Sequence, residues 1–165
     1  MSGRTDLGAA RRITGAVALG SYLVMGALLY FTVIPGAGGH VPPDFRLLGY
    51  DAAVIAPFLN ALTPEAGQAY ARLLTGWDRV FAVALAAWLA LVGWRGGGLR
   101  ALVAGLAALY AGIDLAENAA LHRLVFNPAP DPVAVRSASS LTQAKFASLY
   151  LAVLVLIWHL RRPRP

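Results

Sequence analysis

Four long apolar segments constrain the fold of this chain more than any other feature. They comprise residues 13–34, 80–94, 99–113 and 146–160. With their flanks, each reaches or approaches the roughly 20 residues that a helix needs to cross about 30 Å of hydrocarbon. Composition agrees, since 58% of the residues are hydrophobic and only 13% are charged, against roughly 45–50% and 25% in soluble domains. We therefore expect an all-α integral membrane four-helix bundle, with spans at about 13–34, 77–94, 99–118 and 142–160.

The distribution of basic residues predicts the orientation of these spans. Arginines gather at the N-terminus, in the hairpin "WRGGGLR" and in the tail "HLRRPRP", so one side holds eight cations and one acid. The other side holds six cations and seven acids. Because positive loops stay in the cytoplasm, we expect a multi-pass protein of the bacterial inner membrane with both termini cytoplasmic. The same arginines account for the net charge of +6, so membrane lipids rather than nucleic acid are the expected partners.

Two further observations limit the class of protein. The first apolar segment has 22 residues, more than the usual 7–15-residue core of a signal peptide, and is interpreted as an uncleaved anchor. The chain has no cysteine, which excludes disulfides, thiolate catalysis and cysteine-bound metals. No repeat divides the chain, so we expect a single membrane domain over residues 1–165.

The two outer segments, residues 35–76 and 119–141, are longer than the tight inner hairpin. Within the first, Thr63 as N-cap, Pro64 at the first helical position and Glu65 in the first turn predict the start of a helix. Apolar residues then recur at helical spacing as far as Leu74. We expect a short amphipathic helix on the outer side, lying on the membrane or over the bundle, that turns at Gly76 into the second span.

Small residues form stripes along the second and third spans. The second span has one stripe with a spacing of four, and the third has two overlapping stripes. The stripes are Asp78, Ala82, Ala86 and Ala90; Ala104, Ala108, Gly112 and Ala116; and Ala104, Ala107, Ala111, Asp114 and Asn118. Such stripes let helices approach closely, so the acids should face protein rather than lipid. They are equally compatible with a homodimer or with a subunit of a membrane complex.

Polar residues from three spans are expected to meet at one depth. The helical rise places Asp114, Lys145 and Asp78 about 22, 20 and 24 Å from the cytoplasmic boundary. An isolated charge there would cost at least about 2.5–3.5 kcal/mol. Lys145 is therefore predicted to pair with Glu117 or Asp114, which leaves at least one carboxylate without a cation of its own. Asn118 and His122 follow Glu117 toward the outer surface.

This polar cluster has several possible roles, which the sequence alone leaves open. It could be structural, with ion pairs and hydrogen bonds that set the helix register. It could line an outward-opening pocket for a lipid or amphipathic small molecule, with Asp78, Asp114, Glu117, Asn118 and Lys145 as polar anchors. It could instead catalyse acid/base chemistry on a lipid-like substrate, with Glu117 or Asp114 as proton donor and Asp78 as its partner. Two acids at one depth give no continuous path for ion conduction.

A metal site is not expected. Asp114, Asn118 and His122 form a column at i, i+4 and i+8, but di-metal sites in helical bundles use Glu-x-x-His on two helices, and this chain has none. His122 is interpreted as an imidazole that caps the surface end of the helix. No phosphate-binding loop or nucleophilic triad occurs, and no cofactor is expected.

Two stretches carry a family resemblance: "GYDAAVIAPFLNALTPEAGQAYARLLTGWDRVFAVAL" and "AGIDLAEN". Together they resemble a widespread group of small bacterial four-helix inner-membrane proteins with an Asp-x-x-Glu-Asn element in the third span. The resemblance covers residues 49–118 and implies a shared set of positions, namely Tyr70, Asp78, Asp114, Glu117 and Asn118. Ala82 and Val83 stand where the group has a proline. The architecture is also similar to the sterol-isomerase and sigma-2-receptor superfamily, by topology and one acid early in the second span.

Overall fold

The computed structural model describes residues 2–94, 97–127 and 131–162, and all regular secondary structure in these ranges is helical. Four continuous helical stretches are long and apolar enough to cross a membrane. They are Asp6–Gly36, Pro64–Gly93, Leu99–Val125 and Pro132–Arg161. The prediction of an all-α four-helix bundle is therefore confirmed, and the chain is a multi-pass membrane protein.

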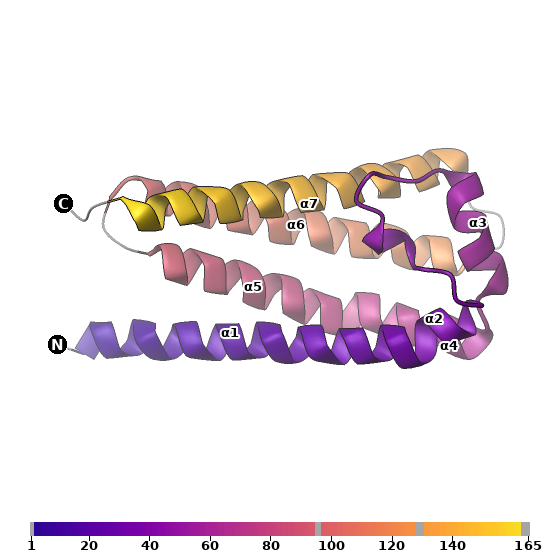
Figure 1. The fold of residues 1–165 in the computed structure, drawn as a ribbon, viewed down its shortest axis with the longest axis horizontal. Helices are drawn as coiled ribbons and strands as arrows, with labels where there is room; N and C mark the ends of the chain where they lie inside the picture. The colour runs from indigo at the N-terminus through magenta and orange to yellow at the C-terminus, as the bar shows by residue number, and fades with distance from the viewer. Residues whose placement is uncertain (1, 95–96, 128–130, 163–165) are drawn as a thin grey trace.

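The elements follow one another as an up-and-down bundle with one excursion on the outer side (Figure 1). The first span consists of α1 (Ser2–Leu28), the π-turn η1 (Leu29–Val33) and α2 (Ile34–Gly36). The excursion contains η2 (Pro43–Phe45) and α3 (Ala52–Ala61), and the second span joins α4 (Pro64–Arg72), η3 (Leu73–Trp77) and α5 (Asp78–Gly93). The third and fourth spans are α6 (Leu99–Val125) and α7 (Pro132–Arg161).

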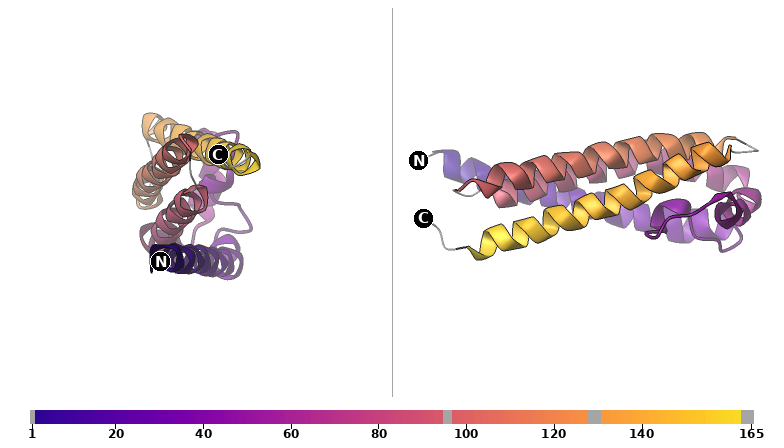
Figure 2. Two further views of the ribbon diagram at one scale, coloured as in Figure 1. Left: turned by 90° about the vertical axis from the view of Figure 1, so that its left-hand side faces the viewer. Right: turned by 90° about the horizontal axis from the view of Figure 1, so that it is seen from above.

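The helices pack as an open row rather than a closed square. α1 packs on α5, α5 packs on α6, and α6 packs on α7. Within the described ranges, α1 and α7 are not a pair that packs extensively. The end-on view in Figure 2 shows this order, with α1 at one end of the row and the α6–α7 pair at the other. The bundle therefore leaves a side open between α1 and α7.

The expected short amphipathic helix on the outer side is present as α4, but the predicted turn at Gly76 is wrong. The N-cap was predicted correctly, because Thr63 Oγ1 accepts from the Ala66 amide and Pro64 is the first helical residue. However, the helix does not turn at Gly76. It passes through one π-turn, Leu73–Trp77, straight into α5. A π-turn inserts a residue without breaking the helix. It therefore changes the direction of the side chains before it relative to those after it.

The outer segment expected at residues 119–141 is also largely helical. α6 continues to Val125 and α7 begins at Pro132, with Asp131 as N-cap accepting from the Val133 amide. The predicted boundaries followed the loss of hydrophobicity, whereas the helices extend past the apolar stretch. Their added turns build an outer extension of the bundle.

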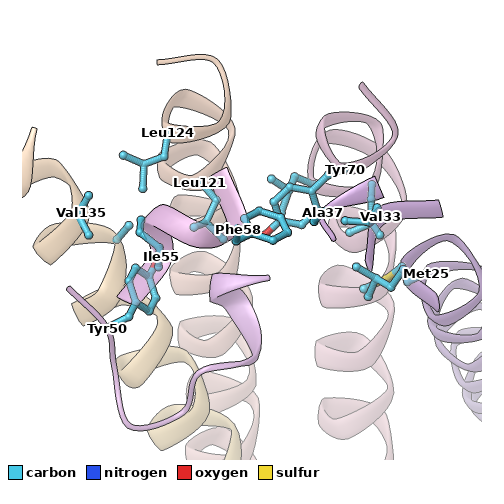
Figure 3. Close-up of a cluster of buried hydrophobic side chains, with 14 residues drawn as sticks. Met25, Val33, Ala37, Tyr50, Ile55, Phe58, Tyr70, Leu121, Leu124 and Val135 are labelled. Carbon is cyan, nitrogen blue, oxygen red and sulfur yellow. The ribbon is translucent and has the colours of Figure 1, made fainter. Parts of the chain in front are cut away.

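An apolar core fills this outer extension (Figure 3). Phe58 of α3 and Tyr70 of α4 meet edge to face, with ring centroids 5.5 Å apart. Leu121 and Val135, from the extensions of α6 and α7, are fully buried in the same cluster. α3, the short helix that does lie outside the spans, thus covers the outer end of the bundle.

The inner end is fixed by side chains that satisfy the last carbonyls of α5. The Arg11 Nε–H donates to the Leu91 carbonyl over 2.8 Å, and the His159 ring lies 3.0 Å from the Gly93 carbonyl. Helix ends leave carbonyls without intrahelical partners, so these contacts hold α1 and α7 to the end of α5. The hairpin predicted after α5 includes residues 95–96, which lie outside the described residues.

Candidate binding site

Ion pairs around Lys145 form the centre of the polar cluster. Lys145 Nζ on α7 lies 3.3 Å from Asp114 Oδ1 and 2.5 Å from Glu117 Oε2, both on α6. The prediction that Lys145 pairs with one of these acids is confirmed, and it pairs with both. Asp114 and Glu117 are three residues apart, which places them on one face of the helix. All three residues are at most 8% exposed, so the attraction acts with little screening by water.

A chain of hydrogen bonds links this centre to the outer loop. The Thr142 hydroxyl donates to Glu117 Oε1 over 2.5 Å, and the Tyr50 hydroxyl lies 3.4 Å from Thr142 Oγ1. Burial raises the pKa of Tyr50 to about 12, so the phenol keeps its proton. Because Thr142 gives its one proton to Glu117, the phenol is the donor to Thr142. Glu117 therefore has both oxygens engaged, one by Lys145 and one by Thr142.

Asp44 is a part of the site that sequence reasoning missed. It lies in η2, on the turn-rich segment "VPPDF", yet it is only 7% exposed. The Tyr70 hydroxyl donates to Asp44 Oδ1 over 2.8 Å. Burial raises the pKa of Asp44, against the opposing effects of Lys145 and of the Tyr70 hydrogen bond. No periodic pattern marks an acid in a turn, so only the return of this loop to the bundle reveals it.

Asp78, like Asp44, is a buried carboxylate without an ion pair among the described residues. It is 5% exposed, and no lysine, arginine or histidine in the described ranges lies within ion-pair distance of it. Arg79, the adjacent cation, is exposed. Asn118 lies beside Asp78, but neither polar atom of the Asn118 side chain has a partner with hydrogen-bond geometry among the described residues, and the same holds for Asp114 Oδ2. Buried polar groups normally have partners, so this side of the cluster has unused hydrogen-bonding capacity.

A cavity of about 210 Å³ lies on this side of the cluster. Its polar wall is formed by Asp44, Asp78, Asp114 and Lys145. Its remaining wall is apolar or aromatic and includes Met25, Phe45, Tyr110, Phe146 and Leu149. Tyr22 and Phe45 are 58% and 49% exposed, so both belong to the mouth. The cavity was expected between the second, third and fourth spans, and the structure adds α1 and η2 to its walls.

The expected site residues thus fall into three groups. Asp78, Asp114 and Lys145 line the cavity, whereas Glu117, Asn118 and Tyr70 lie behind it and contact its walls. His122 takes no part: it is half-buried, and its ring lies against Phe126 with centroids 5.1 Å apart. Among the described residues, no three acidic or histidine side chains are grouped as a metal site would require.

Comparisons of the chain with models of protein families, with curated proteins and with solved structures found no match. The resemblance drawn from the sequence therefore stays a prediction. The functional assignment rests on the geometry of the cavity and its charges.

Proposed function

We propose that this protein binds an amphipathic small molecule or lipid, whose head group enters the cavity from the outer leaflet. The observation that carries the proposal is a cavity with two kinds of wall, one of carboxylates and Lys145 and one of aromatic and aliphatic side chains. Ligand pockets combine a mostly apolar lining with a few placed polar groups in this way.

The charges of the cavity wall favour a particular class of head group. Three carboxylates line it, and the lysine beside them is shared with Glu117. Among the described residues, Asp114 Oδ2 has no hydrogen-bond partner and Asp78 has no ion pair. A head group that donates hydrogen bonds would satisfy these oxygens, whereas an anionic head group would be repelled.

The proposal also fits the open side of the bundle. Because α1 and α7 do not pack extensively in the part of the chain that the structure describes, a molecule in the bilayer can approach the exposed mouth at Tyr22 and Phe45 without crossing the helical row. Orientation in the bacterial inner membrane, with both termini cytoplasmic, would place this opening in the outer leaflet. A role as an accessory subunit of a membrane complex is compatible with the same site, with the bound lipid as part of the interface.

Acid/base catalysis on a lipid-like substrate is the second candidate, and one observation favours it. Asp78 and Asp114 both face the cavity, and only Asp114 is ion-paired within the described ranges. Two carboxylates in different environments can divide the roles of acid and base. Glu117, which was considered as a proton donor, is held by Lys145 and Thr142 and does not line the cavity.

Photolabelling tests the binding proposal. Membranes that contain the protein are illuminated with a fatty alcohol that bears a diazirine, and the labelled residues are mapped by mass spectrometry. We expect saturable labelling of cavity residues such as Phe146 and its loss in Leu149→Trp, which fills the cavity. Leu151→Trp is the matched control, since Leu151 is exposed on the same helix. Labelling confined to lipid-facing residues would contradict the proposal.

A further inference from the structure

A second, apolar groove runs along the interface of α1 and α5. It has a volume of about 490 Å³ and is lined by Gly15, Ala18, Tyr22, Phe81, Leu85 and Trp88, among others. α1 and α5 are antiparallel, and the lining runs from residue 15 to 22 on α1 and from 81 to 88 on α5. The groove therefore extends about 10 Å along the helices, from Tyr22 and Phe81 toward the inner end.

The groove and the polar cavity share two residues. Tyr22 and Phe81 line both, and their rings pack together with centroids 5.8 Å apart. On the outer side of this ring pair are Asp44, Asp78 and Lys145, and on the inner side the lining is almost entirely apolar. The two hollows thus adjoin at this ring pair, the outer one partly polar and the inner one apolar.

Trp88 lines the inner end of the groove. A side chain added at Gly15 would meet the Trp88 indole at 2.9 Å from Nε1, so the absence of a side chain at Gly15 lets the indole lie close to α1 at this point. Because glycine has no side chain, two helices can pack closely at such a contact with a large ring between them. The indole therefore lies against α1 at the level of Gly15, where the lining of the groove ends.

We propose that this groove holds the aliphatic tail of a single-chain amphiphile whose head group occupies the polar cavity. The inference rests on the proposed function and adds to it the shape of the ligand and the position of its tail. The head enters beside Asp78, the chain passes along the outside of the packed Tyr22–Phe81 ring pair, and its end lies near Trp88. A lining with almost no polar atoms suits an alkyl chain, because nothing in it would satisfy a polar group.

Fluorescence of Trp88 tests the position of the tail. Bromine quenches tryptophan on contact, so dodecanol carrying a terminal bromine is titrated into the purified protein in detergent. The other tryptophans, Trp77, Trp94 and Trp158, are each 44–54% exposed. Their quenching should rise without saturation as the probe partitions into the micelle. We expect an additional saturable phase of quenching in the wild type that Trp88→Phe removes.

Two variants and one second probe sharpen this test. Ala18→Phe places a ring in the groove and should abolish the saturable phase, whereas Gly20→Phe, on the lipid-facing side of α1 with open space around it, should retain it. Dodecanoic acid carrying a terminal bromine should bind at least about tenfold more weakly, because its carboxylate meets the acids of the cavity. If Ala18→Phe does not fold, Trp88→Phe still decides the outcome.

The results separate this inference from the proposed function. A saturable phase that persists in Trp88→Phe, or quenching that only rises linearly with probe, would overturn the position of the tail. If photolabelling of the cavity persists in that case, the proposed function stands without this inference. If cavity labelling is absent as well, both fail.

Discussion

Lys145 is the residue on which the balance of buried charge depends. It faces Asp114 and Glu117 directly, and its charge also acts on Asp44. Exposed cations nearby, such as Arg79, form no ion pair with these buried acids in the described ranges. An ion pair taken out of water adds little net stability, but removing one partner leaves a buried charge without compensation.

Lys145→Met should therefore destabilise the fold strongly. The expected loss is about 3–5 kcal/mol of unfolding free energy, because Asp114 and Glu117 then lie buried without a cation. The measurement is unfolding in detergent micelles. The double variant Lys145→Met with Glu117→Gln should recover part of the loss, since the amide is neutral and still accepts from Thr142.

The control for this prediction is Arg79→Met, which removes an exposed cation and should change stability by no more than about 0.5 kcal/mol. Equal effects of Lys145→Met and Arg79→Met would show that the buried pairs contribute nothing specific. A double variant no more stable than Lys145→Met alone would argue against uncompensated charge as the cause.

At the scale of elements, the segment between α2 and α3 decides the composition of the cavity. α7 holds the backbone of this segment through two hydrogen bonds: the Tyr50 amide donates to Ser139 Oγ, and Gln143 Nε2 donates to the Leu48 carbonyl. Gly49 lies between them with a positive φ of 87°, and a side chain there would meet Gln143 Nε2 at 2.8 Å. Glycine at this position lets the segment lie close to α7 and carry Asp44 back over the bundle.

Gly49→Ala should weaken both stability and binding. The left-handed conformation costs about 1–2 kcal/mol for a residue with a side chain, and the contact with Gln143 adds to this. Gly39→Ala is the matched control, because Gly39 has a φ of 86° but open space around it. We expect unfolding measurements to show a larger loss for Gly49→Ala and photolabelling of the cavity to fall only in that variant. Equal losses would mean that the contact with α7 is unimportant.

A stripe of small residues does not by itself identify the buried face of a helix. In the stripe on α5, Asp78, Ala82 and Ala86 are buried as predicted, whereas Ala90 is half-buried. On α6, the stripe with three-four spacing that leads to Asp114 and Asn118 faces protein, whereas Ala108, Gly112 and Ala116 are exposed. Both stripes satisfy the spacing rule. Only the position of the neighbouring helices distinguishes them.

At the scale of the whole molecule, the spans bring both ends of the chain to one end of the bundle (Figure 1). The opposite end carries α3, η2 and the outer extensions of α4, α6 and α7. The arginine bias predicts that the end with the termini is cytoplasmic. The cavity and its acids would then belong to the outer half of the membrane.

Cysteine labelling tests this orientation without background, because the chain has no cysteine of its own. Arg12→Cys and Arg136→Cys each introduce one thiol at an exposed position, near the two opposite ends. A membrane-impermeant maleimide should label Arg136→Cys in intact spheroplasts and Arg12→Cys only after permeabilisation. The reverse pattern would invert the topology and place the cavity in the inner leaflet.

The sequence by itself determined the membrane class, the number of spans and the pairing of Lys145. These follow from hydrophobic length, since a span needs about 20 apolar residues, and from helical rise, which sets the depth of each polar residue. Both are local quantities that can be counted along the chain. The N-cap at Thr63 was predictable for the same reason.

Only the tertiary structure decided what surrounds the cluster. Asp44, Tyr50 and the α1 wall come from parts of the chain far from Asp78 in sequence, and the packing of a loop against α7 brings them there. The ends of α6 and α7 continue past the apolar stretch because burial against α3 stabilises them, which hydropathy does not report. Which face of a helix is buried, and whether a cavity remains beside a carboxylate, depend on how neighbouring helices fill space, and no local pattern encodes that.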